Sequence, residues 1–208
     1  MKNSISIIDR LQKEEELYVK SGEDKIIFII LTDNNNQEGA VKIYIDGSNS
    51  NVQILGTIIG SGKQQIKLYT FQDHIKKESV SDLLIKSVLF DEARLAYEGL
   101  IKIEKDAQKS NAYQKNQNLL IGKSAWADSR PKLEILANDV RCTHGATIGK
   151  INEEEIFYLA TRGLERKLAE KLIIKGFLQE VVNKVTDVNI KIDLEKKIEY
   201  KIDQLLKN

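Results

Sequence analysis

The chain is 208 residues long, a length that fits one large domain or one domain with a modest appendage. Its 32 Lys and Arg residues balance 31 Asp and Glu residues, and this balance excludes the strongly basic surface of a nucleic-acid-binding protein or a polybasic membrane anchor. Hydrophobic residues make up 41% of the chain and charged residues 30%, which is typical of a soluble globular protein.

Cysteine and histidine are scarce, with one Cys and two His in the whole chain. A single thiol cannot form an internal disulfide, which fits a reducing compartment. A zinc site built from Cys and His alone usually needs four ligands. A Cys/His metal centre in this protein must therefore take ligands from another subunit.

The N-terminal segment carries no recognisable targeting signal. Residues 1–10 lack the long apolar core and the small-residue cleavage site of a signal peptide. The longest apolar stretch, Ile26 to Leu31, is far shorter than the ~20 residues that span a bilayer. We therefore expect a cytoplasmic protein that does not bind membranes.

From about Leu17 to Gly149 the sequence consists of short apolar runs separated by turn residues. The runs are rich in Ile, and β-branched side chains favour strands. A short helix is possible only at the start, around Ile7 to Leu17. Clusters of Asp, Asn, Ser and Gly mark the turns between runs. The predicted strands include residues 26–30, 41–45, 52–55, 65–69, 83–85, 100–103, 119–121 and 133–136.

Many short strands at even spacing predict a β-sandwich, a barrel or a β-solenoid. Asn and Ser at the turns and the loosely regular spacing of the runs favour the solenoid. Aromatic residues, at 6% of the chain, are also few for a wide sandwich core. The pattern alone leaves sandwich and solenoid as alternatives.

The pattern changes to a helical one at Ile151. Asn152 is a good N-cap, the next three residues are Glu, and Gly163 can end the helix. A second helix is predicted to begin near Glu165. Its apolar face is predicted to contain Leu168, Leu172, Phe177, Val181 and Val185.

The last segment is predicted to begin with an extended connector from Asp187 to Asp193, and Asp193 is a plausible cap for a final helix. The sequence thus predicts a β domain over residues 1–150 and a small helical domain over residues 151–208.

Two possible catalytic signals fail. Gly60-Ser61-Gly62-Lys63 resembles part of a phosphate-binding loop, but Thr57 replaces its first glycine and Gln64 replaces its hydroxyl residue, so a glycine turn between strands is the better interpretation. His74 lies in a polar stretch that is predicted to be solvated, and no Gly-x-Ser-x-Gly motif accompanies it. No hydrolase is indicated.

The segment from Asn138 to Thr147 contains the only Cys and one of the two His. Cys142 and His144 are two residues apart, so on a strand they share a face. A thiolate beside an imidazole forms half of a soft-metal site suited to zinc or iron–sulfur. The alternative is a Cys that packs as a small hydrophobe beside a hydrogen-bonded His.

Several blocks of this sequence, in this order, resemble the SufB/SufD family of the SUF iron–sulfur assembly system. The resemblance is strongest from about Gly99 to Val182. The blocks are Asn-Leu-Leu-Ile-Gly at 118–122, Arg-Pro-Lys-Leu-Glu-Ile at 130–135, Asp-Val-Arg-Cys-Thr-His-Gly-Ala-Thr at 139–147, Ile-Phe-Tyr-Leu-Ala-Thr-Arg-Gly-Leu at 156–164 and Ile-Ile-Lys-Gly-Phe at 173–177.

The resemblance implies a right-handed parallel β-helix with a C-terminal helical domain, and it decides between solenoid and sandwich. It also implies a scaffold and not an enzyme, one that joins a SufC-type ABC ATPase and pairs through its β-helix with a SufB-like chain or with a second copy of itself. A transient iron–sulfur cluster would form at the junction between subunits, and the isolated chain would bind none stably.

The resemblance also assigns roles to particular residues. Cys142 and His144 match the Cys-x-His-Gly-Ala-Thr motif of SufD and are expected to be cluster ligands. Ala125 stands where SufB-type chains carry their acceptor Cys, and Gly145 stands where they carry a Glu, so this chain looks SufD-like. The expected contacts with the ATPase are Phe157, Tyr158, Arg162, Gly163, Leu164 and Phe177.

Two further functions stay open at this point. Family members are considerably longer and carry a large N-terminal helical region that has no counterpart in these 208 residues. A β-helix can also act on carbohydrate if acidic residues align on successive turns. A metal-independent adaptor, in which Cys142 belongs to the core, is the third hypothesis.

Overall fold

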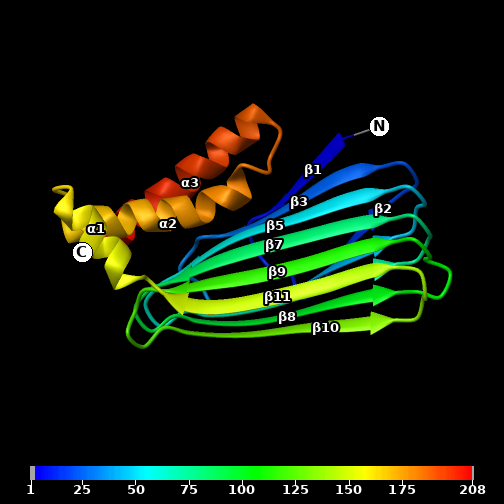
Figure 1. Cartoon of the computed structure of the whole chain (residues 1–208), viewed down its shortest axis with the longest axis horizontal. Coiled ribbons are helices and arrows are strands. Elements are labelled where there is room, and N and C mark those ends of the chain that lie inside the picture. Colours follow the sequence, from blue (N-terminus) through cyan, green and yellow to red (C-terminus); the bar gives the residue numbers. More distant parts are fainter. Residues whose placement is uncertain (1–2, 208) are drawn as a thin grey trace.

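The structure is a computed structural model that describes residues 3–207. Within this range, eleven strands are followed by three helices (Figure 1). The strands are β1 Asn3–Ile8, β2 Glu15–Val19, β3 Asp24–Leu31, β4 Gln37–Ile45, β5 Asn51–Gly60, β6 Gln65–His74, β7 Val80–Leu89, β8 Arg94–Ile103, β9 Asn111–Leu120, β10 Trp126–Ile135 and β11 Arg141–Lys150. The helices are α1 Glu153–Thr161, α2 Arg166–Val182 and α3 Val188–Leu206.

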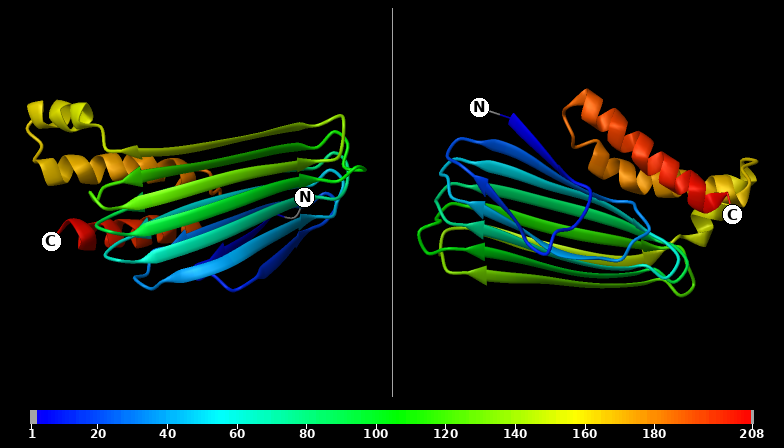
Figure 2. Two further views of the ribbon diagram at one scale, coloured as in Figure 1. Left: turned by 90° about the horizontal axis from the view of Figure 1, so that it is seen from below. Right: turned by 180° about the vertical axis from the view of Figure 1, so that it is seen from behind.

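The strands form two parallel sheets that the chain visits alternately. Odd-numbered strands form sheet A in the order β1-β3-β5-β7-β9-β11, and even-numbered strands form sheet B in the order β10-β8-β6-β4-β2. Each strand therefore pairs with the strand one full turn later, which gives a two-sheet solenoid (Figure 2). The predicted mainly-β solenoid is confirmed, and the sandwich alternative is wrong.

Alternation along the strands separates two hydrophobic cores. In β3, Ile27, Ile29 and Leu31 point into the solenoid, where they pack against inward residues of sheet B such as Ile43. The intervening residues Phe28 and Ile30 point outward and pack under the helices. A strand that is buried on both faces reads as an unbroken apolar run, as residues 26–31 do.

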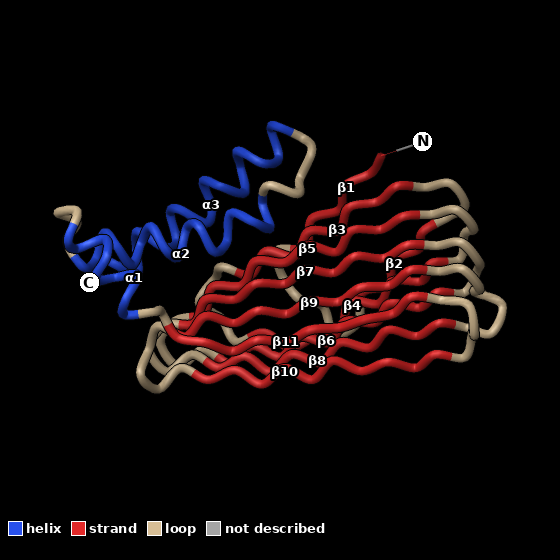
Figure 3. Tube along the Cα trace, in the orientation of Figure 1, coloured by secondary structure: helices blue, strands red, loops and turns tan. Residues whose placement is uncertain are grey.

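The helices form a separate layer over the outer face of sheet A (Figure 3). Ile174, Leu178 and Val181 of α2 and Ile198 and Ile202 of α3 are buried against this face. Charged side chains add to the attachment, because Lys86 of β7 pairs with Glu180 at 2.5 Å and Lys184 pairs with Asp82 at 3.1 Å. The helical region thus shares a core with the solenoid.

The N-terminal end of the solenoid is closed by its own chain. Ile8, Leu11 and Val19 are buried there, and the Leu11 N–H donates to Oε1 of Gln37 at 2.8 Å. The crossing segment passes so close to Gly39 that a Cβ at this position would lie 1.9 Å from a backbone oxygen. Only glycine fits at this place.

The predicted helix over Ile7 to Leu17 is wrong. This segment contains the end of β1 and the start of β2, because β1 pairs with β3 and β2 pairs with β4. Pairing with neighbouring strands thus overrides the local helical spacing of the apolar residues.

The predicted connector between Asp187 and Asp193 is also wrong. The helix α3 starts directly after Asp187, whose Oδ1 accepts a hydrogen bond from the Ile190 N–H at 3.0 Å. Packing on the sheet stabilises the helix in this stretch, since Ile190 is partly buried against the core that the helices share with sheet A.

The apolar face predicted for the second helix is partly wrong. Val181 is buried, whereas Leu168 and Leu172 are about half exposed and Ala169 and Ile174 take the buried positions. No helix in residues 3–207 is long and apolar enough to cross a membrane.

Candidate functional site

The last turn of the solenoid consists of β10 and β11, and no strand of the described chain covers it. β11 ends sheet A and β10 ends sheet B, so each has one edge without a strand partner among residues 3–207. An open edge exposes backbone donors and acceptors that can pair with another chain. Figure 1 shows both strands at the end of the solenoid opposite to β1.

Side chains that point into the solenoid from paired strands of sheet A stack in rows, which we call inward columns. These columns continue into the last turn. Cys142 lies in register with Ala112 of β9, His144 with Gln114 and Ile148 with Asn118. The three β9 residues are at most 3% exposed, whereas Ile148 is 48% exposed. The last turn thus presents to solvent the side chains that earlier turns bury.

Sheet B contributes apolar side chains to the same open end. Leu133 and Ile135 of β10 lie in register with the buried Ile101 and Ile103 of β8. Leu133 is 36% exposed and Ile135 is 41% exposed. Together with Ile148 they make this end an apolar surface with open strand edges.

Cys142 and His144 lie on the same face of β11 but differ in their surroundings. Cys142 is half buried and packs beside Val140 against a small cluster that includes Ala112. Burial raises the pKa of its thiol to about 11, so the thiol is protonated at neutral pH. His144 is exposed.

The residues near Cys142 do not complete a metal site within one chain. No group of three or more His, Cys, Asp or Glu side chains in the part of the chain described here is placed to hold a metal ion. Cys142 and His144 supply a soft thiolate and an imidazole, which suit iron and iron–sulfur clusters. The role of these two residues as cluster ligands stays a prediction.

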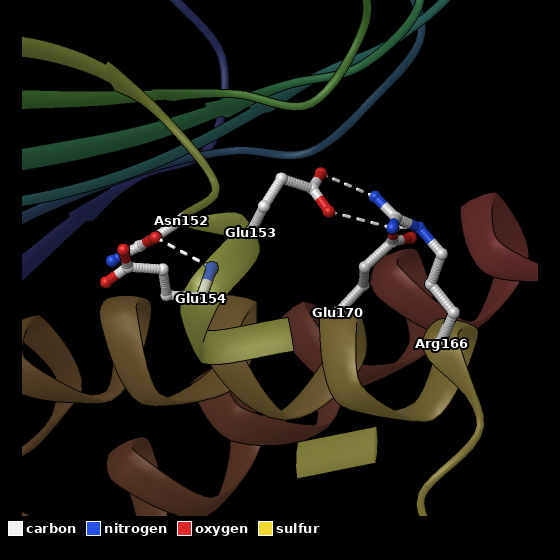
Figure 4. A network of polar contacts seen from close by, with 5 residues as sticks. All are labelled: Asn152, Glu153, Glu154, Arg166 and Glu170. Carbon is white, nitrogen blue, oxygen red and sulfur yellow. Dashed lines mark hydrogen bonds and ion pairs between the residues drawn. The ribbon is translucent and has the colours of Figure 1, made fainter. Parts of the chain in front are cut away.

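The first helix is held in place mainly by polar contacts. Asn152 caps α1 by accepting a hydrogen bond from the Glu154 N–H at 2.9 Å, and Arg166 of α2 donates to both carboxylate oxygens of Glu153 at 2.7 and 2.9 Å (Figure 4). Arg166 also contacts Glu170. Ile156 is the one residue of α1 that is buried.

The residues predicted to contact an ATPase divide into two groups. Phe157 is 71% exposed and Tyr158 is 57% exposed, and the guanidinium of Arg162 lies 5.1 Å from the Tyr158 ring centre. Gly163 ends this helix with a φ of +86°, and Leu164 follows half buried. These residues are contiguous at the end of α1.

Phe177 lies apart from that group. It is half buried on the face of α2 that packs on sheet A, where the Lys86 ammonium lies 4.3 Å from its ring centre. This contact gives Phe177 a place in the attachment of the helices to the solenoid.

His74 was predicted to be solvated, and this prediction is wrong. Its side chain is completely buried inside the solenoid, with Nδ1 2.7 Å from the Ser79 hydroxyl and Nε2 2.8 Å from the Ser81 hydroxyl. Burial lowers its pKa to about 4. The alternation Ile66, Leu68 and His74 on even positions of β6 was the signal that places it inside.

Sequence reasoning also missed a row of polar side chains inside the later turns. Thr70 bonds the Tyr97 hydroxyl at 2.8 Å, and Gln72 donates to Gln114 at 3.2 Å. Asn118 donates to a backbone oxygen of β11 at 3.2 Å. The interior next to the open end is thus polar, whereas the first turns are filled with Ile, Leu and Val.

Comparison with known proteins identifies a family and several similar proteins. The profile of the family described as SUF system FeS cluster assembly, SufBD core domain, matches residues 27–177. The chain is 36% identical over 147 residues to the iron-sulfur cluster assembly protein SufD of Escherichia coli (strain K12), a match that covers 71% of this chain and 35% of that protein.

Two further relatives give the same picture. Identity to the SufD protein of Bacillus subtilis (strain 168) is 33% over 165 residues, which cover 79% of this chain and 37% of that protein. Identity to the SufBD family protein ycf24 of Galdieria sulphuraria is 32% over 135 residues, or 65% of this chain and 61% of that protein. The chain thus spans little more than a third of the length of the two SufD proteins.

The family profile covers both sheets of the solenoid from β3 onward and extends through α1 into α2. It includes Cys142 and His144 and the exposed group at the end of α1. The chain therefore belongs to the SufBD family.

Proposed function

We propose that this protein is a non-enzymatic scaffold subunit in iron–sulfur cluster assembly. One observation carries the proposal: Cys142 and His144 point to the inner side of the last turn, which no further strand of the described residues covers. In this proposal the cluster is cargo, built at the junction of two subunits and passed on. The isolated chain binds none stably, because one chain supplies too few ligands.

The partner at the open end is a second chain of the same family, either a SufB-like chain or an identical copy. Open strand edges and exposed apolar residues such as Leu133 and Ile148 favour a partner that adds strands and covers the end. For an identical copy, a twofold axis makes the paired edge strands antiparallel. Such a pair brings two thiols and two imidazoles to the junction, enough for four ligand positions.

The thiol of Cys142 must lose its proton to bind iron. Its pKa of about 11 disfavours this in the free chain, since half burial removes water from the thiolate. A nearby cation compensates the thiolate for the hydration that it lacks. Iron and the thiolate therefore stabilise one another. Cluster loading is therefore coupled to proton release.

The ATPase contact lies on the helical side. Phe157, Tyr158 and Arg162 form an exposed group of aromatic and guanidinium side chains, the residue types that are enriched at interfaces. Because α1 directly follows β11, a movement of α1 acts on the strand that carries Cys142 and His144. An ABC-type ATPase bound there can drive conformational change at the junction.

The first experiment tests cluster loading. The chain is co-purified with its partner subunit and the ATPase, reconstituted anaerobically with iron and sulfide, and assayed by absorption and iron content. We expect Cys142→Ala and His144→Ala each to reduce loading, and Thr143→Ala, on the opposite face of the same strand, to leave it unchanged. Equal loading in all three variants would show that the ligand assignment is wrong.

A second experiment tests the ATPase contact. The double variant Phe157→Ala/Tyr158→Ala should weaken capture of the ATPase while the far-ultraviolet circular dichroism stays unchanged. Tyr200→Ala is the matched control, since Tyr200 is 68% exposed on α3 and lies outside the α1 group. Loss of capture only in the control would place the contact on α3 and contradict the proposal.

A carbohydrate-active β-helix is disfavoured by how charges alternate across sheet B. Such a function needs acids on successive turns. In register on the outer face, Glu38 is followed by Lys67 and Ala96, and Asp73 is followed by Lys102. Glu38 and Lys67 form an ion pair at 2.9 Å. The acids are thus paired with bases and not aligned with one another.

A further inference from the structure

A pocket of about 660 Å³ lies between the turns after β3 and β5 and the end of α3. Its charged lining residues are the lysines Lys63, Lys201 and Lys207, and no Asp or Glu lines it. The other large pockets of the described residues each combine lysines with carboxylates. All charged side chains that line this pocket are therefore positive. We call it the lysine pocket.

Lys201 is the buried member of the lysine pocket. Only 4% of this residue is exposed, and its ammonium group donates to the side-chain oxygen of Asn34 and to the backbone oxygen of Asp33. Both acceptors are uncharged, and the Asp33 carboxylate acts on the ammonium through space and not by a hydrogen bond. An ammonium has three donors, and two are used here. Burial lowers the pKa of the Lys201 ammonium, and the nearby Asp33 carboxylate partly opposes this shift. An anion bound in the pocket would favour the charged form, and one donor of Lys201 is left for it.

The polar side chains around the lysines present donors. The Asn34 amide oxygen is engaged by Lys201 and also accepts from the Ser61 hydroxyl at 3.4 Å. The Asn36 amide oxygen accepts from the Gln65 N–H at 2.8 Å. Both amide oxygens are engaged by the protein, so the hydrogen-bonding groups that these two side chains can offer a ligand are their NH₂ donors. Donors beside cations fit an anion.

Nearby negative charge is smaller than the charge of the lysines. Asp33 accepts a hydrogen bond from the Asn35 N–H at 3.1 Å and Asp91 accepts from the Gly62 N–H at 2.8 Å, and neither lines the pocket. The carboxyl end of α3 adds about half a negative charge. Three ammonium groups exceed these contributions, so the pocket retains a positive potential.

We propose that the lysine pocket binds the phosphate groups of a small phosphate-bearing ligand, a diphosphate being the simplest. Recognition rests on the ammonium groups of Lys63, Lys201 and Lys207 and not on a phosphate-binding loop. No helix follows the Gly60 to Lys63 turn, and the Gly62 N–H is already bonded to Asp91. The pocket lies at the carboxyl ends of early strands, whereas Cys142 lies near the start of β11, so it is separate from the proposed cluster site.

The test uses the full chain, with isothermal titration calorimetry of inorganic pyrophosphate at low and at high salt. We expect saturable binding that weakens with salt. The double variant Lys63→Gln/Lys207→Gln should lower the affinity by about tenfold or more, because two exposed ammonium partners of the phosphate are removed. Both residues are exposed, so the fold should not depend on them.

Lys196→Gln is the matched control, since Lys196 is exposed on the same helix and lies outside the pocket. The affinity of this variant for pyrophosphate should stay within about twofold of that of the parent chain. Absence of saturable binding, or an equal loss in Lys196→Gln and the double variant, would overturn the proposal.

A second arm compares pyrophosphate with ADP and with a poly-glutamate peptide. Binding of ADP that is lost in the same double variant supports the phosphate assignment and extends it to nucleotides. Binding of the peptide without binding of either phosphate compound would show an acidic protein segment to be the ligand and overturn it. Because no arm uses iron or sulfide, failure here leaves the cluster proposal untouched.

Discussion

The two ends of the solenoid are built from similar strands but finish differently. At the first end, Ile8, Leu11 and Val19 are buried by a crossing segment that bonds to Gln37. At the last end, Leu133 and Ile148 occupy equivalent inward columns and are exposed. A chain that closes one end and leaves the other open directs association to the open end.

The interior changes along the same axis. One row of inward side chains runs from Ile27 of β3 through Ile54 and Leu83 to Gln114 and reaches His144 of β11. Apolar burial stabilises the first turns, whereas the later turns rely on hydrogen bonds between side chains whose net contribution is smaller. The apolar part of the solenoid thus supports a more polar end where the candidate ligands lie.

The largest expected effect comes from placing a charge at each end. Ile8→Glu buries a carboxylate at a position that is 5% exposed and should lower the free energy of unfolding by about 4 kcal/mol. Ile148→Glu, at a position 48% exposed, should cost less than about 1 kcal/mol and instead abolish pairing at the open end. Urea denaturation and analytical ultracentrifugation measure the two effects.

The same two variants can also show that the distinction between a closed first end and an open last end is wrong. Ile7→Glu, on the opposite face of β1 at a position 47% exposed, controls for added charge at the first end. If Ile8→Glu disrupts association and leaves stability unchanged, the first end is the interface. If Ile148→Glu unfolds the chain, the last end is not an independent surface.

His74 tests the sealed interior. Because its folded pKa is about 4 and its ordinary value is 6.5, the unfolded chain takes up a proton first as pH falls. The free energy of unfolding should be insensitive to this group above pH 6.5 and fall by about 3 kcal/mol in total between pH 6.5 and pH 4.

The contribution of His74 is isolated by comparison with His74→Gln. Urea denaturation of both chains at several pH values cancels the other titrating groups, since the two chains share them. Stability that falls equally in both chains would mean that His74 is reached by water in the folded protein.

Cys142 tests the open end. Its thiol pKa of about 11, against an ordinary value of 9.0, gives roughly a 100-fold smaller thiolate fraction near neutral pH. Alkylation by iodoacetamide should therefore be much slower in the folded chain than in urea, and its rate should keep rising until about pH 11. A rate that levels off below pH 9 would contradict the half-buried position of this side chain.

Alternation and turn chemistry are local signals, and they predicted most strands and the strand face that Cys142 and His144 share. They left solenoid and sandwich as alternatives, and the resemblance to the SufB/SufD family decided between them. Prediction from the sequence was wrong where contacts with a partner strand or helix determine the secondary structure. The two ends of residues 7–17, where a helix was expected, pair with β3 and β4. Residues 187–193 were expected to form a connector but contain the start of α3. Which end of the solenoid is closed depends on the path of a single crossing segment, and no pattern in the sequence reports it.

His74 shows the same limit at the level of one side chain. Its polar neighbours in sequence, Gln72 and Asp73, suggested solvent, yet alternation places His74 and Gln72 inside. There Gln72 bonds Gln114 of β9, and His74 bonds serines at the start of the next strand. Gln114 is 42 residues from Gln72, and the more distant serine is 7 residues from His74. The exposure of Phe157 is equally invisible in sequence, since an aromatic residue in an amphipathic helix is usually core.

The smallest expected effect concerns α1, which directly follows the open end. Ile156 is its one buried residue, and Arg166 holds it through Glu153. Arg166→Gln should speed hydrogen exchange of the amides in residues 153–161 and leave global unfolding unchanged, because exposed ion pairs contribute little to stability. Lys175→Gln removes a comparable ion pair to Glu199, but its helices share a hydrophobic core, so their exchange should not change. Slow α1 exchange in Arg166→Gln would mean that this helix is fixed to the solenoid by packing, and then an ATPase that binds it would move the last turn as a rigid unit.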